Sequence, residues 1–349
     1  MITTCHRDMQ IIINRIINME KRSLGLAALP VSPIAFGAWA IGGWMWGGAD
    51  NKESLRAIHA CQDHGITSLD TAPIYGFGLS EELVGEAIKG KRDRYEILTK
   101  CGMRWEGTRG SYFFTSNDNS GIQREIYTYS GRESIIAECE DSLKRLGTDY
   151  IDLYQVHWPD STTPIEEAME AFRILMEQGK IRAAGVSNYS VEQMEQASSV
   201  VDLSSNQVPY SMVRRDIEQD VVPWCQDNNC GILAYSPLQR GLLTGKITPD
   251  YHFAPGDSRP ETPHFKVNNL IKTNRFLEKI KTMAEEKGAS LSQLVIAWTL
   301  CQPGITVALV GARTEEQVIQ NAGALEVHLS EQEVDTINRE LEMLKLELD

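Results

Sequence analysis

The chain has 349 residues, of which 42% are hydrophobic, and its 48 acidic and 34 basic side chains give a formal net charge of −14. This composition is typical of a globular protein with a sizeable core, and it excludes a disordered or fibrous chain. The negative charge disfavours nucleic acid and anionic membranes as partners, because both would repel the protein.

Short apolar runs alternate with helix-like segments along the chain, as a parallel α/β fold requires. We predict strands over residues 33–37, 67–70, 95–100, 151–157, 183–187, 203–207, 231–235 and 307–310. Predicted helices occupy residues 54–64, 80–88, 132–146, 165–178, 191–200, 217–228, 275–286, 291–301 and 315–321, with a last one from Ser330 onward. Strands of this number and order indicate a closed (β/α)8 TIM barrel.

Several of these helices have recognisable ends. The candidate N-terminal caps are followed within three residues by acidic or amide side chains, and they are Ser80, Ser190 and Thr314. The glycines expected to end helices are Gly147, Gly179 and Gly231. Two stretches lie outside the alternation: residues 101–131, which we predict to be a long aromatic loop above the strand ends, and the insertion 239–274.

The cysteines, at positions 5, 61, 101, 139, 225, 230 and 301, form an odd set without a C-x-x-C pair. This argues against a disulfide framework and a structural zinc site, so we expect no metal and a reducing, cytoplasmic environment. Residues 11–17 are apolar, but Asn14 and Arg15 interrupt them and no small-residue cleavage site precedes Met19. They make a poor signal peptide, and no apolar run approaches the ~18 residues of a membrane-spanning helix.

Four ionisable side chains lie at or just after the ends of predicted strands. Asp70 ends the strand 67–70 and Tyr75 follows five residues later, while Lys100 and His157 end the strands 95–100 and 151–157. Because the carboxyl ends of parallel strands converge on one face, we expect these candidate catalytic residues to meet there. Each one alone is more typical of an ordinary turn, loop or core residue, and only their joint order favours a site.

Together with Gly-Val-Ser-Asn at 185–188, Ser-Pro-Leu at 236–238 and Gly-Ala-Arg-Thr at 311–314, these residues resemble the aldo-keto reductase superfamily of nicotinamide-dependent (β/α)8-barrel carbonyl reductases. The resemblance is to the bacterial NADP(H)-dependent type, related to potassium-channel β subunits, and it runs from Met19 to the C-terminus. It implies a disordered, dispensable leader over residues 1–18, a single barrel domain over 19–349, and a hairpin over 21–32 that closes the bottom of the barrel.

The same resemblance implies that Tyr75 is the general acid/base in the interconversion of small aldehydes or ketones and alcohols. Tyrosine has a reference pKa near about 10, and the ammonium of Lys100 would lower the pKa of Tyr75 toward the operating pH. Asp70 would keep Lys100 charged, and His157 would hydrogen-bond the carbonyl oxygen while a nicotinamide supplies hydride to the carbonyl carbon.

A Rossmann cofactor site is not supported, because no G-x-G-x-x-G follows a predicted strand. Residues 241–246 resemble a phosphate loop, but the motif is one residue short and Ile247 replaces its Ser or Thr, which excludes a nucleoside triphosphatase. The resemblance instead places Ser187, Asn188 and Gln207 at the nicotinamide carboxamide, with Tyr210 stacked on the ring.

The other cofactor-binding residues that the resemblance implies are Gly37, Ala38, Trp39, Asp70, Ser236, Pro237, Leu238, Arg240, Gly241, Lys246, Gly311, Arg313, Gln317, Gln320 and Asn321. Arg313 offers a planar fork for a 2′-phosphate. Many relatives have arginine in place of Gln317, glutamate in place of Gln320 and proline in place of Leu309. We therefore expect NADP(H) to be the preferred cofactor and NAD(H) to be an alternative.

The candidate substrate residues are Trp39, Tyr75, His157 and Trp158. With Trp44 and Trp46 they predict an aromatic wall suited to an apolar aldehyde or a sugar face, or else a plug in the barrel mouth. Two rival functions are a redox-sensing nicotinamide-binding regulatory protein and a barrel hydrolase or isomerase. The latter would need a metal cluster or a second catalytic carboxylate, and the sequence presents neither.

Overall fold

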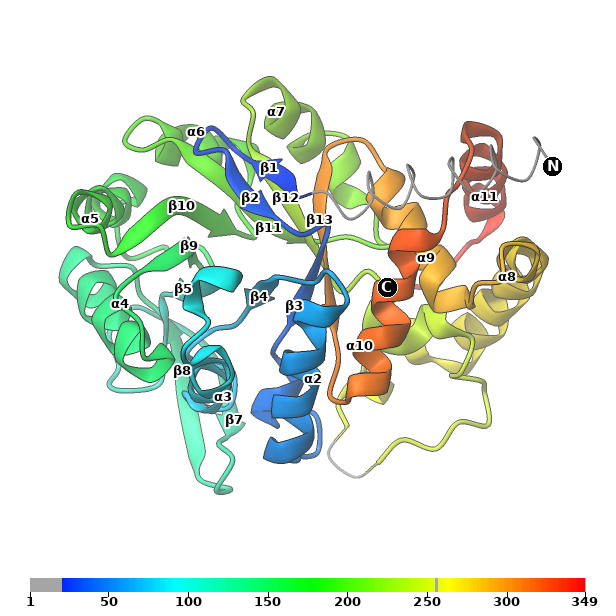
Figure 1. The fold of residues 1–349 in the computed structure, drawn as a ribbon, viewed down its shortest axis with the longest axis horizontal. Helices are drawn as coiled ribbons and strands as arrows, with labels where there is room; N and C mark the ends of the chain where they lie inside the picture. Colours follow the sequence, from blue (N-terminus) through cyan, green and yellow to red (C-terminus); the bar gives the residue numbers. More distant parts are fainter. Residues whose placement is uncertain (1–20, 255–256, 349) are drawn as a thin grey trace.

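The computed structural model describes residues 21–254 and 257–348, and its centre is a closed parallel barrel with the strand order β10-β11-β12-β13-β3-β4-β5-β9 (Figure 1). The barrel strands are β3 (Ile34–Gly37), β4 (Ser68–Asp70), β5 (Glu96–Cys101), β9 (Ile151–Val156), β10 (Ile181–Ser187), β11 (Leu203–Pro209), β12 (Gly231–Tyr235) and β13 (Ile305–Gly311). The predicted (β/α)8 fold is confirmed. The predicted leader over residues 1–18 lies outside the described residues.

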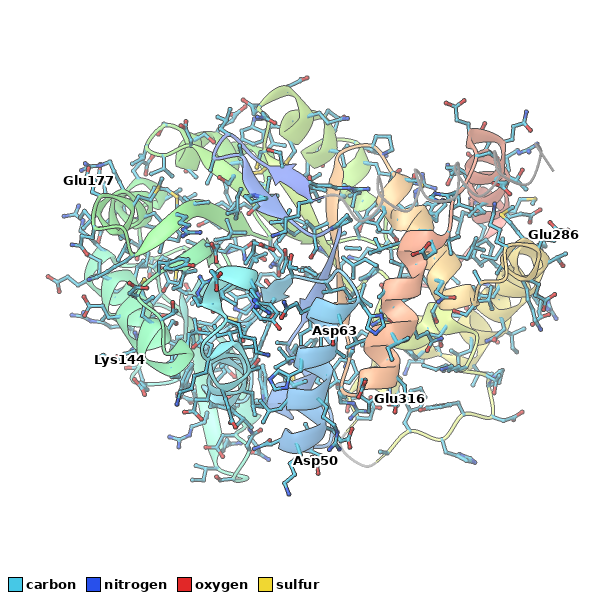
Figure 2. All side chains as sticks on the ribbon, in the orientation of Figure 1. Asp50, Asp63, Lys144, Glu177, Glu286 and Glu316 are labelled. Carbon is cyan, nitrogen blue, oxygen red and sulfur yellow. The ribbon has the colours of Figure 1, made fainter. Side chains whose placement is uncertain are left out.

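Helices surround the barrel on its outer face (Figure 1). They are α2 (Asn51–Asp63), α3 (Leu79–Ile88), α4 (Arg132–Leu146), α5 (Ile165–Glu177), α6 (Val191–Ser198), α7 (Val221–Asp227), α8 (Val267–Glu286), α9 (Leu291–Cys301), α10 (Glu315–Ala322) and α11 (Glu331–Met343). Most of their charged side chains face outward, as Lys144, Glu177 and Glu286 do in Figure 2, while Glu81 of α3 and Glu138 of α4 are buried. Among the residues described, no helix is long and apolar enough to cross a membrane.

The helix boundaries confirm most of the predicted signals and correct three. Ser190 forms a full capping box with Gln193, and Thr314 accepts a hydrogen bond from the backbone N–H of Gln317. Ser80 is not a cap, because it lies inside α3 and its hydroxyl donates to the carbonyl of Ala38. The predicted helix 217–228 is divided into a 3-10 turn at Asp216–Glu218 and α7, and α8 begins eight residues earlier than predicted.

The predicted hairpin is present as β1 (Arg22–Leu24) and β2 (Leu29–Val31), which pair antiparallel. Its apolar side chains join a buried cluster inside the barrel that includes Leu98, Leu153 and Leu233. Gly231 begins β12 rather than ending a helix, and a Cβ there would lie 2.2 Å from Leu24. The glycine therefore makes room for the hairpin to close the amino-terminal end of the barrel.

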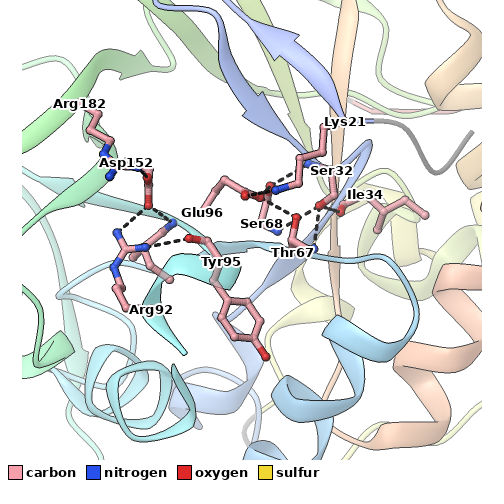
Figure 3. Close-up of polar contacts among 11 residues, drawn as sticks. Lys21, Ser32, Ile34, Thr67, Ser68, Arg92, Tyr95, Glu96, Asp152 and Arg182 are labelled. Atoms are coloured by element: carbon pink, nitrogen blue, oxygen red, sulfur yellow. Dashed lines mark hydrogen bonds and ion pairs between the residues drawn. The ribbon is translucent and has the colours of Figure 1, made fainter. Parts of the chain in front are cut away.

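Two buried carboxylates organise the polar contacts at the amino-terminal ends of β4, β5 and β9 (Figure 3). Asp152 pairs with Arg92 at 2.6 Å and with Arg182 at 2.9 Å. Glu96 accepts hydrogen bonds from the hydroxyls of Thr67 and Ser68. These groups satisfy one another, as expected for the end of a barrel that serves stability.

The prediction of a long loop over residues 101–131 is wrong. The segment forms a three-stranded antiparallel sheet of β6 (Met103–Arg104), β8 (Gln123–Thr128) and β7 (Ser111–Asn117), in that order. Its strands are rich in aromatic and β-branched residues, and Asp118 holds the turn by accepting hydrogen bonds from the N–H groups of Ser120 and Ile122. This sheet follows β5 directly, so it stands beside the carboxyl-terminal ends of the barrel strands.

Candidate active site

The four predicted catalytic residues meet at the carboxyl-terminal face of the barrel. Lys100, near the end of β5, donates hydrogen bonds to Asp70 at the end of β4 (2.7 Å) and to the hydroxyl of Tyr75 (3.2 Å). The ring of His157, just after β9, lies 5.6 Å from that of Tyr75 in an edge-on arrangement. The turn that carries Tyr75 depends on Gly76, whose φ is +71° and whose Cβ would lie 2.3 Å from a carbonyl oxygen.

Lys100 is fully buried and charged. Burial alone lowers its pKa, but the carboxylate of Asp70 and the hydroxyl of Tyr75 outweigh burial, so the pKa of Lys100 lies above its usual value. The second oxygen of Asp70 accepts a hydrogen bond from Gln207 at 2.8 Å. The carboxylate therefore has a partner on each oxygen and holds the ammonium in place.

The pKa of Tyr75 moves in the opposite direction from the prediction. Burial raises the pKa of this phenol, Lys100 lowers it and Asp70 raises it, and the net direction is upward. The expectation that Lys100 brings the pKa of Tyr75 down toward neutrality is therefore wrong. Tyr75 keeps its proton at neutral pH, which is the form that a proton donor requires.

His157 is neutral. Burial and, after it, the charge of Lys100 hold the pKa of His157 well below its usual range. Its backbone N–H donates to the carbonyl of Cys101 at 2.9 Å, and Asn188 donates to its carbonyl at 3.2 Å. These contacts fix the backbone of His157, and its neutral imidazole can donate a hydrogen bond to a substrate oxygen without carrying a charge of its own.

A cavity of about 690 Å³ opens above these residues. The predicted site residues that line it are Gly37, Trp39, Asp70, Tyr75, His157, Trp158, Ser187, Asn188, Gln207, Ser236, Pro237, Leu238, Arg240, Gly241, Lys246, Gly311, Arg313, Gln317, Gln320 and Asn321. Ala38 and Lys100 are buried behind the wall, Lys100 acting through its contacts with Asp70 and Tyr75.

Tyr210 does not reach the cavity. Its ring stacks on Trp298 with centroids 6.0 Å apart, and its hydroxyl donates to Glu218. Tyr235, at the end of β12, lines the cavity instead, and its hydroxyl donates to the side-chain oxygen of Asn188 at 2.9 Å. Sequence reasoning missed Tyr235, although this tyrosine directly precedes the Ser-Pro-Leu motif that it had singled out.

The carboxyl ends of β10 and β11 present a connected set of polar groups. The hydroxyl of Ser187 donates to the carbonyl of Gln207 at 2.8 Å, and the amide of Asn188 donates to the hydroxyl of Ser187 at 3.0 Å. Asn188 has a left-handed backbone with φ of 61°, which turns its side chain back over the strand ends. The hydrogen bond from Gln207 to Asp70 connects this set of donors and acceptors to the tetrad.

Basic and aromatic side chains line the part of the cavity formed by the segments after β12 and β13. Arg240 lies over the rings of Trp39 and Trp46, with its guanidinium 5.8 and 5.6 Å from their centroids. Arg259, which sequence reasoning did not identify, lies over Trp46 and pairs with Asp257 at 2.6 Å. It sits inside the insertion 239–274, where no local motif marked it.

The loop before α10 is held by its own side chains. Gln317 accepts a hydrogen bond from the backbone N–H of Arg313 at 2.7 Å, and the Arg313 guanidinium donates to the carbonyl of Trp46 at 3.4 Å. Asn321 donates to the carbonyl of Gly311. A cationic side chain and the N-terminus of a helix thus face the same end of the cavity, which suits an anionic group.

A (β/α)8 barrel with a polar tetrad and a ligand-sized cavity at the carboxyl ends of its strands has the architecture of a barrel enzyme. Among the residues described, no three His, Cys, Asp or Glu side chains are grouped as ligands of a metal ion would be. The model of the Aldo/keto reductase family matches residues 33–342. The chain belongs to this family, and the resemblance that its motifs indicate is confirmed.

Relatives cover nearly the whole chain. Aldo-keto reductase YhdN of Bacillus subtilis (strain 168) is 43% identical over 86% of this chain and 87% of its own length. The NADH-specific methylglyoxal reductase of Escherichia coli (strain K12) is 37% identical over 93% of this chain and 98% of its own length. Among solved structures, the glycerol dehydrogenase AKR11B4 from Gluconobacter oxydans has a TM-score of 0.84 at 38% identity over 94% and 96% of the two chains. An aldo/keto reductase from Klebsiella pneumoniae, in complex with NADP and acetate, has a TM-score of 0.68 at 31% identity. The match covers 92% of this chain and 94% of the Klebsiella chain.

Proposed function

We propose that this protein is an NAD(P)H-dependent oxidoreductase that interconverts aldehydes or ketones and alcohols, with Tyr75 as the general acid/base. The contact that carries the proposal is the hydrogen bond of the buried Lys100 ammonium to the Tyr75 hydroxyl at 3.2 Å. Lys100 is itself held by Asp70 at 2.7 Å. This is the arrangement needed to stabilise a phenolate once Tyr75 has given up its proton.

The proposed reduction consumes one carbonyl compound, one reduced nicotinamide and one proton from solvent. A bound reduced nicotinamide supplies a hydride, that is two electrons and one proton, to the carbonyl carbon. Tyr75 donates its phenolic proton to the carbonyl oxygen, and neutral His157 donates a hydrogen bond to the same oxygen as charge develops on it. These two transfers give an alcohol and the oxidised cofactor. Lys100 stabilises the phenolate left on Tyr75 until a proton from solvent replaces the one transferred.

The residues around the cavity fit a nicotinamide dinucleotide. In this proposal Ser187, Asn188 and Gln207 bind the carboxamide, and the ring of Tyr235, rather than Tyr210, stacks on the nicotinamide. A Cβ at Gly311 would meet only a carbonyl oxygen at 3.7 Å, so a ligand can approach the backbone there.

The remaining cavity residues suit the phosphate and adenosine parts of the cofactor. We assign Ser236, Leu238, Arg240 and Lys246 to the pyrophosphate; the buried Nε of Arg240 has no hydrogen-bond partner among the described residues. Arg313, Gln317 and Asn321 would take the adenosine half. The Klebsiella structure with NADP supports NADP(H) as the preferred cofactor, and the NADH-specific E. coli relative supports NAD(H) as an alternative.

We also propose a cytoplasmic location. The described cysteines are free thiols; Cys61, Cys101, Cys139, Cys225 and Cys230 are buried, and Cys301 is exposed. Unpaired buried thiols are typical of proteins from a reducing compartment.

The Tyr75→Phe variant tests the mechanism. We expect it to lower the turnover of a carbonyl substrate by at least about 10³-fold while the Kd for NADPH changes little, because only the proton donor is lost. Quenching of NADPH fluorescence measures binding, and the loss of NADPH absorbance with a panel of small carbonyls measures turnover. Near-wild-type turnover of the variant would end this mechanism, and cofactor binding without turnover by the wild type would favour the regulatory alternative.

A further inference from the structure

Five aromatic rings curve around the part of the cavity next to the tetrad. We call them the aromatic arc; in order they are Trp39, Trp44, Phe114, Phe113 and Trp158, and all five line the cavity. The centroids of successive rings lie 6.4, 6.1, 5.3 and 5.2 Å apart. The arc begins where Trp39 stacks on Tyr75, with centroids 6.1 Å apart, and it ends at the residue after His157. A substrate whose carbonyl reaches Tyr75 and His157 must therefore place the rest of its structure against these rings.

A β-bulge supplies two of the five rings. Successive side chains of a regular strand point to opposite faces, so Phe113 and Phe114 could not both face the cavity from an unbroken β7. In the pairing of β7 with β8, Tyr112 lies opposite Tyr127 and Phe114 lies opposite Ile126, which leaves Phe113 as an extra residue. A bulge of this kind redirects a side chain, and here it turns both phenylalanines to the cavity.

Polar contacts hold the arc in position. The indole N–H of Trp44 donates to the hydroxyl of Ser116 on β7 at 3.0 Å. Asn119, in the turn after β7, donates to the carbonyls of Gly42 and Gly76 at 3.0 and 3.3 Å. The three-stranded sheet is thus tied to the loops after β3 and β4, which carry Trp39 and Tyr75. These contacts fix Trp44 and the turn after β7, so a ligand gains the contacts of that part of the arc without ordering it first.

The arc offers a ligand almost no polar partner. The indole N–H of Trp44 is already bonded, and that of Trp39 is buried away from the cavity. The indole N–H of Trp158 has no hydrogen-bond partner among the described residues, so it is the remaining indole donor of the arc. The charged side chains of the described lining are Asp70, which Lys100 and Gln207 engage, and the basic Arg240, Lys246, Arg259 and Arg313 of the segments after β12 and β13. Of these four, Arg240 has a ring contact with the arc, at the Trp39 end. A carboxylate or polyol lying on the arc would lose its hydration shell and find at most the indole N–H of Trp158 as a donor in return.

We propose, building on the carbonyl reduction proposed above, that the arc makes uncharged aromatic aldehydes the preferred substrates and that Phe113 determines this preference. Phe113 and Trp158 are tilted by 48°, and Phe113 and Phe114 by 56°. An aryl group can make edge-to-face contacts with such rings, whereas a saturated ring of the same size gains only the burial of its surface. The aldehyde carbon receives the hydride and its oxygen receives the Tyr75 proton, so the product is a benzylic alcohol.

The test compares kcat/KM for benzaldehyde, cyclohexanecarbaldehyde, 4-carboxybenzaldehyde and glyceraldehyde at saturating NADPH, in the wild type, Phe113→Ala and Tyr112→Ala. Tyr112 is the matched control because it is an exposed aromatic residue of the same strand that does not line the cavity. We expect the wild type to favour benzaldehyde over cyclohexanecarbaldehyde by about two- to tenfold and over 4-carboxybenzaldehyde by about 100-fold. Phe113→Ala should lose most of the first preference, and Tyr112→Ala should stay within about twofold of the wild type.

Two measurements separate the possible failures. Melting temperatures and the Kd for NADPH, both expected to be unchanged in the two variants, show that Phe113→Ala acts on substrate choice and not on folding. Faster turnover of glyceraldehyde or 4-carboxybenzaldehyde than of benzaldehyde, or equal selectivity in Phe113→Ala and the wild type, would overturn this inference alone. Reduction of no carbonyl compound by a protein that binds NADPH would overturn the proposed function and the inference together.

Discussion

At the scale of single residues, the site depends on a buried cation with three partners. Lys100 donates to Asp70, to Tyr75 and to the carbonyl of Thr71, the last at 2.9 Å. Since an ammonium has three protons to donate, this set satisfies it fully, and its position follows from the ends of β4 and β5. The orientation of the Tyr75 hydroxyl is therefore fixed before any substrate arrives.

Lys100→Met should reduce kcat by about 10²-fold, because the phenolate that forms on Tyr75 loses a charge-assisted hydrogen bond worth roughly 1.5–3 kcal/mol. We expect the Kd for NADPH to change by less than about threefold, since Lys100 does not line the cavity. Single-turnover kinetics and fluorescence titration separate the two effects. A variant whose only change is a small shift of pH optimum would make Lys100 a structural residue.

The directions of two pKa shifts predict the pH dependence of reduction. Reduction needs protonated Tyr75, whose pKa is raised, so this form is lost only above about pH 10. It also needs neutral His157, whose pKa is lowered, so that form is lost only below about pH 6.5. We expect kcat for carbonyl reduction to be flat between these limits when measured with saturating substrate and NADPH. A falling limb near pH 8 in the profile of the wild type would contradict the raised pKa of Tyr75.

At the scale of elements, α10 and the loop before it shape one end of the cavity. Thr314 caps the helix, and Gln317 reaches back to the backbone N–H of Arg313 instead of extending a second charge into the cavity. Among the described residues the Arg313 guanidinium has one partner, the carbonyl of Trp46, and its side chain is exposed. The loop is thus shaped by neutral hydrogen bonds, with Arg313 as its cation.

Arg313→Ala should weaken NADPH binding by roughly 1.5–3 kcal/mol and leave NADH binding nearly unchanged, because only NADPH has the 2′-phosphate. Titration of both reduced cofactors at one ionic strength measures the difference, since salt screens this contact. Equal losses of affinity for NADPH and NADH would show that Arg313 does not contact the 2′-phosphate. An NADH affinity of the wild type equal to that for NADPH would overturn the assigned cofactor preference.

At the scale of the whole molecule, buried ion pairs join the helical layer to the barrel. Glu81 of α3 is fully buried and accepts hydrogen bonds from Thr99 of β5 at 2.6 Å and from Arg145 of α4 at 2.7 Å. Thr99 is the residue before Lys100, so this contact fixes the strand that carries the Lys100 ammonium. A buried carboxylate of this kind stabilises the fold only while both partners remain.

Arg145→Met should lower the free energy of unfolding by about 3 kcal/mol, because it leaves the Glu81 carboxylate buried without its cation. The matched control is Arg173→Met on α5, whose partners Glu170 and Glu177 are at the surface; its loss should stay below about 1 kcal/mol. Urea denaturation followed by circular dichroism measures both variants. Equal destabilisation by the two substitutions would show that the Glu81 contact adds nothing beyond a surface ion pair.

The sequence by itself determined the barrel, the convergence of the four tetrad residues and the helix caps Ser190 and Thr314. Each of these rests on a local signal: the alternation of strands and helices, the position of Asp70 and Lys100 at strand ends, or a cap such as Ser190 three residues before its glutamine. Features of this kind can be predicted from the sequence because they depend on residues that are close together in it.

Only the tertiary structure decided which side chains reach the cavity and how they ionise. Tyr210 and Tyr235 both lie at the ends of adjacent strands, but the ring of Tyr210 stacks on Trp298 of α9, so Tyr235 faces the cavity. The raised pKa of Tyr75 likewise follows from burial, which depends on side chains far away in the chain. The bulge at Phe113 depends on pairing with β8, so no property of β7 alone reveals it. Contacts between distant segments set all three, and for that reason the sequence pattern could not show them.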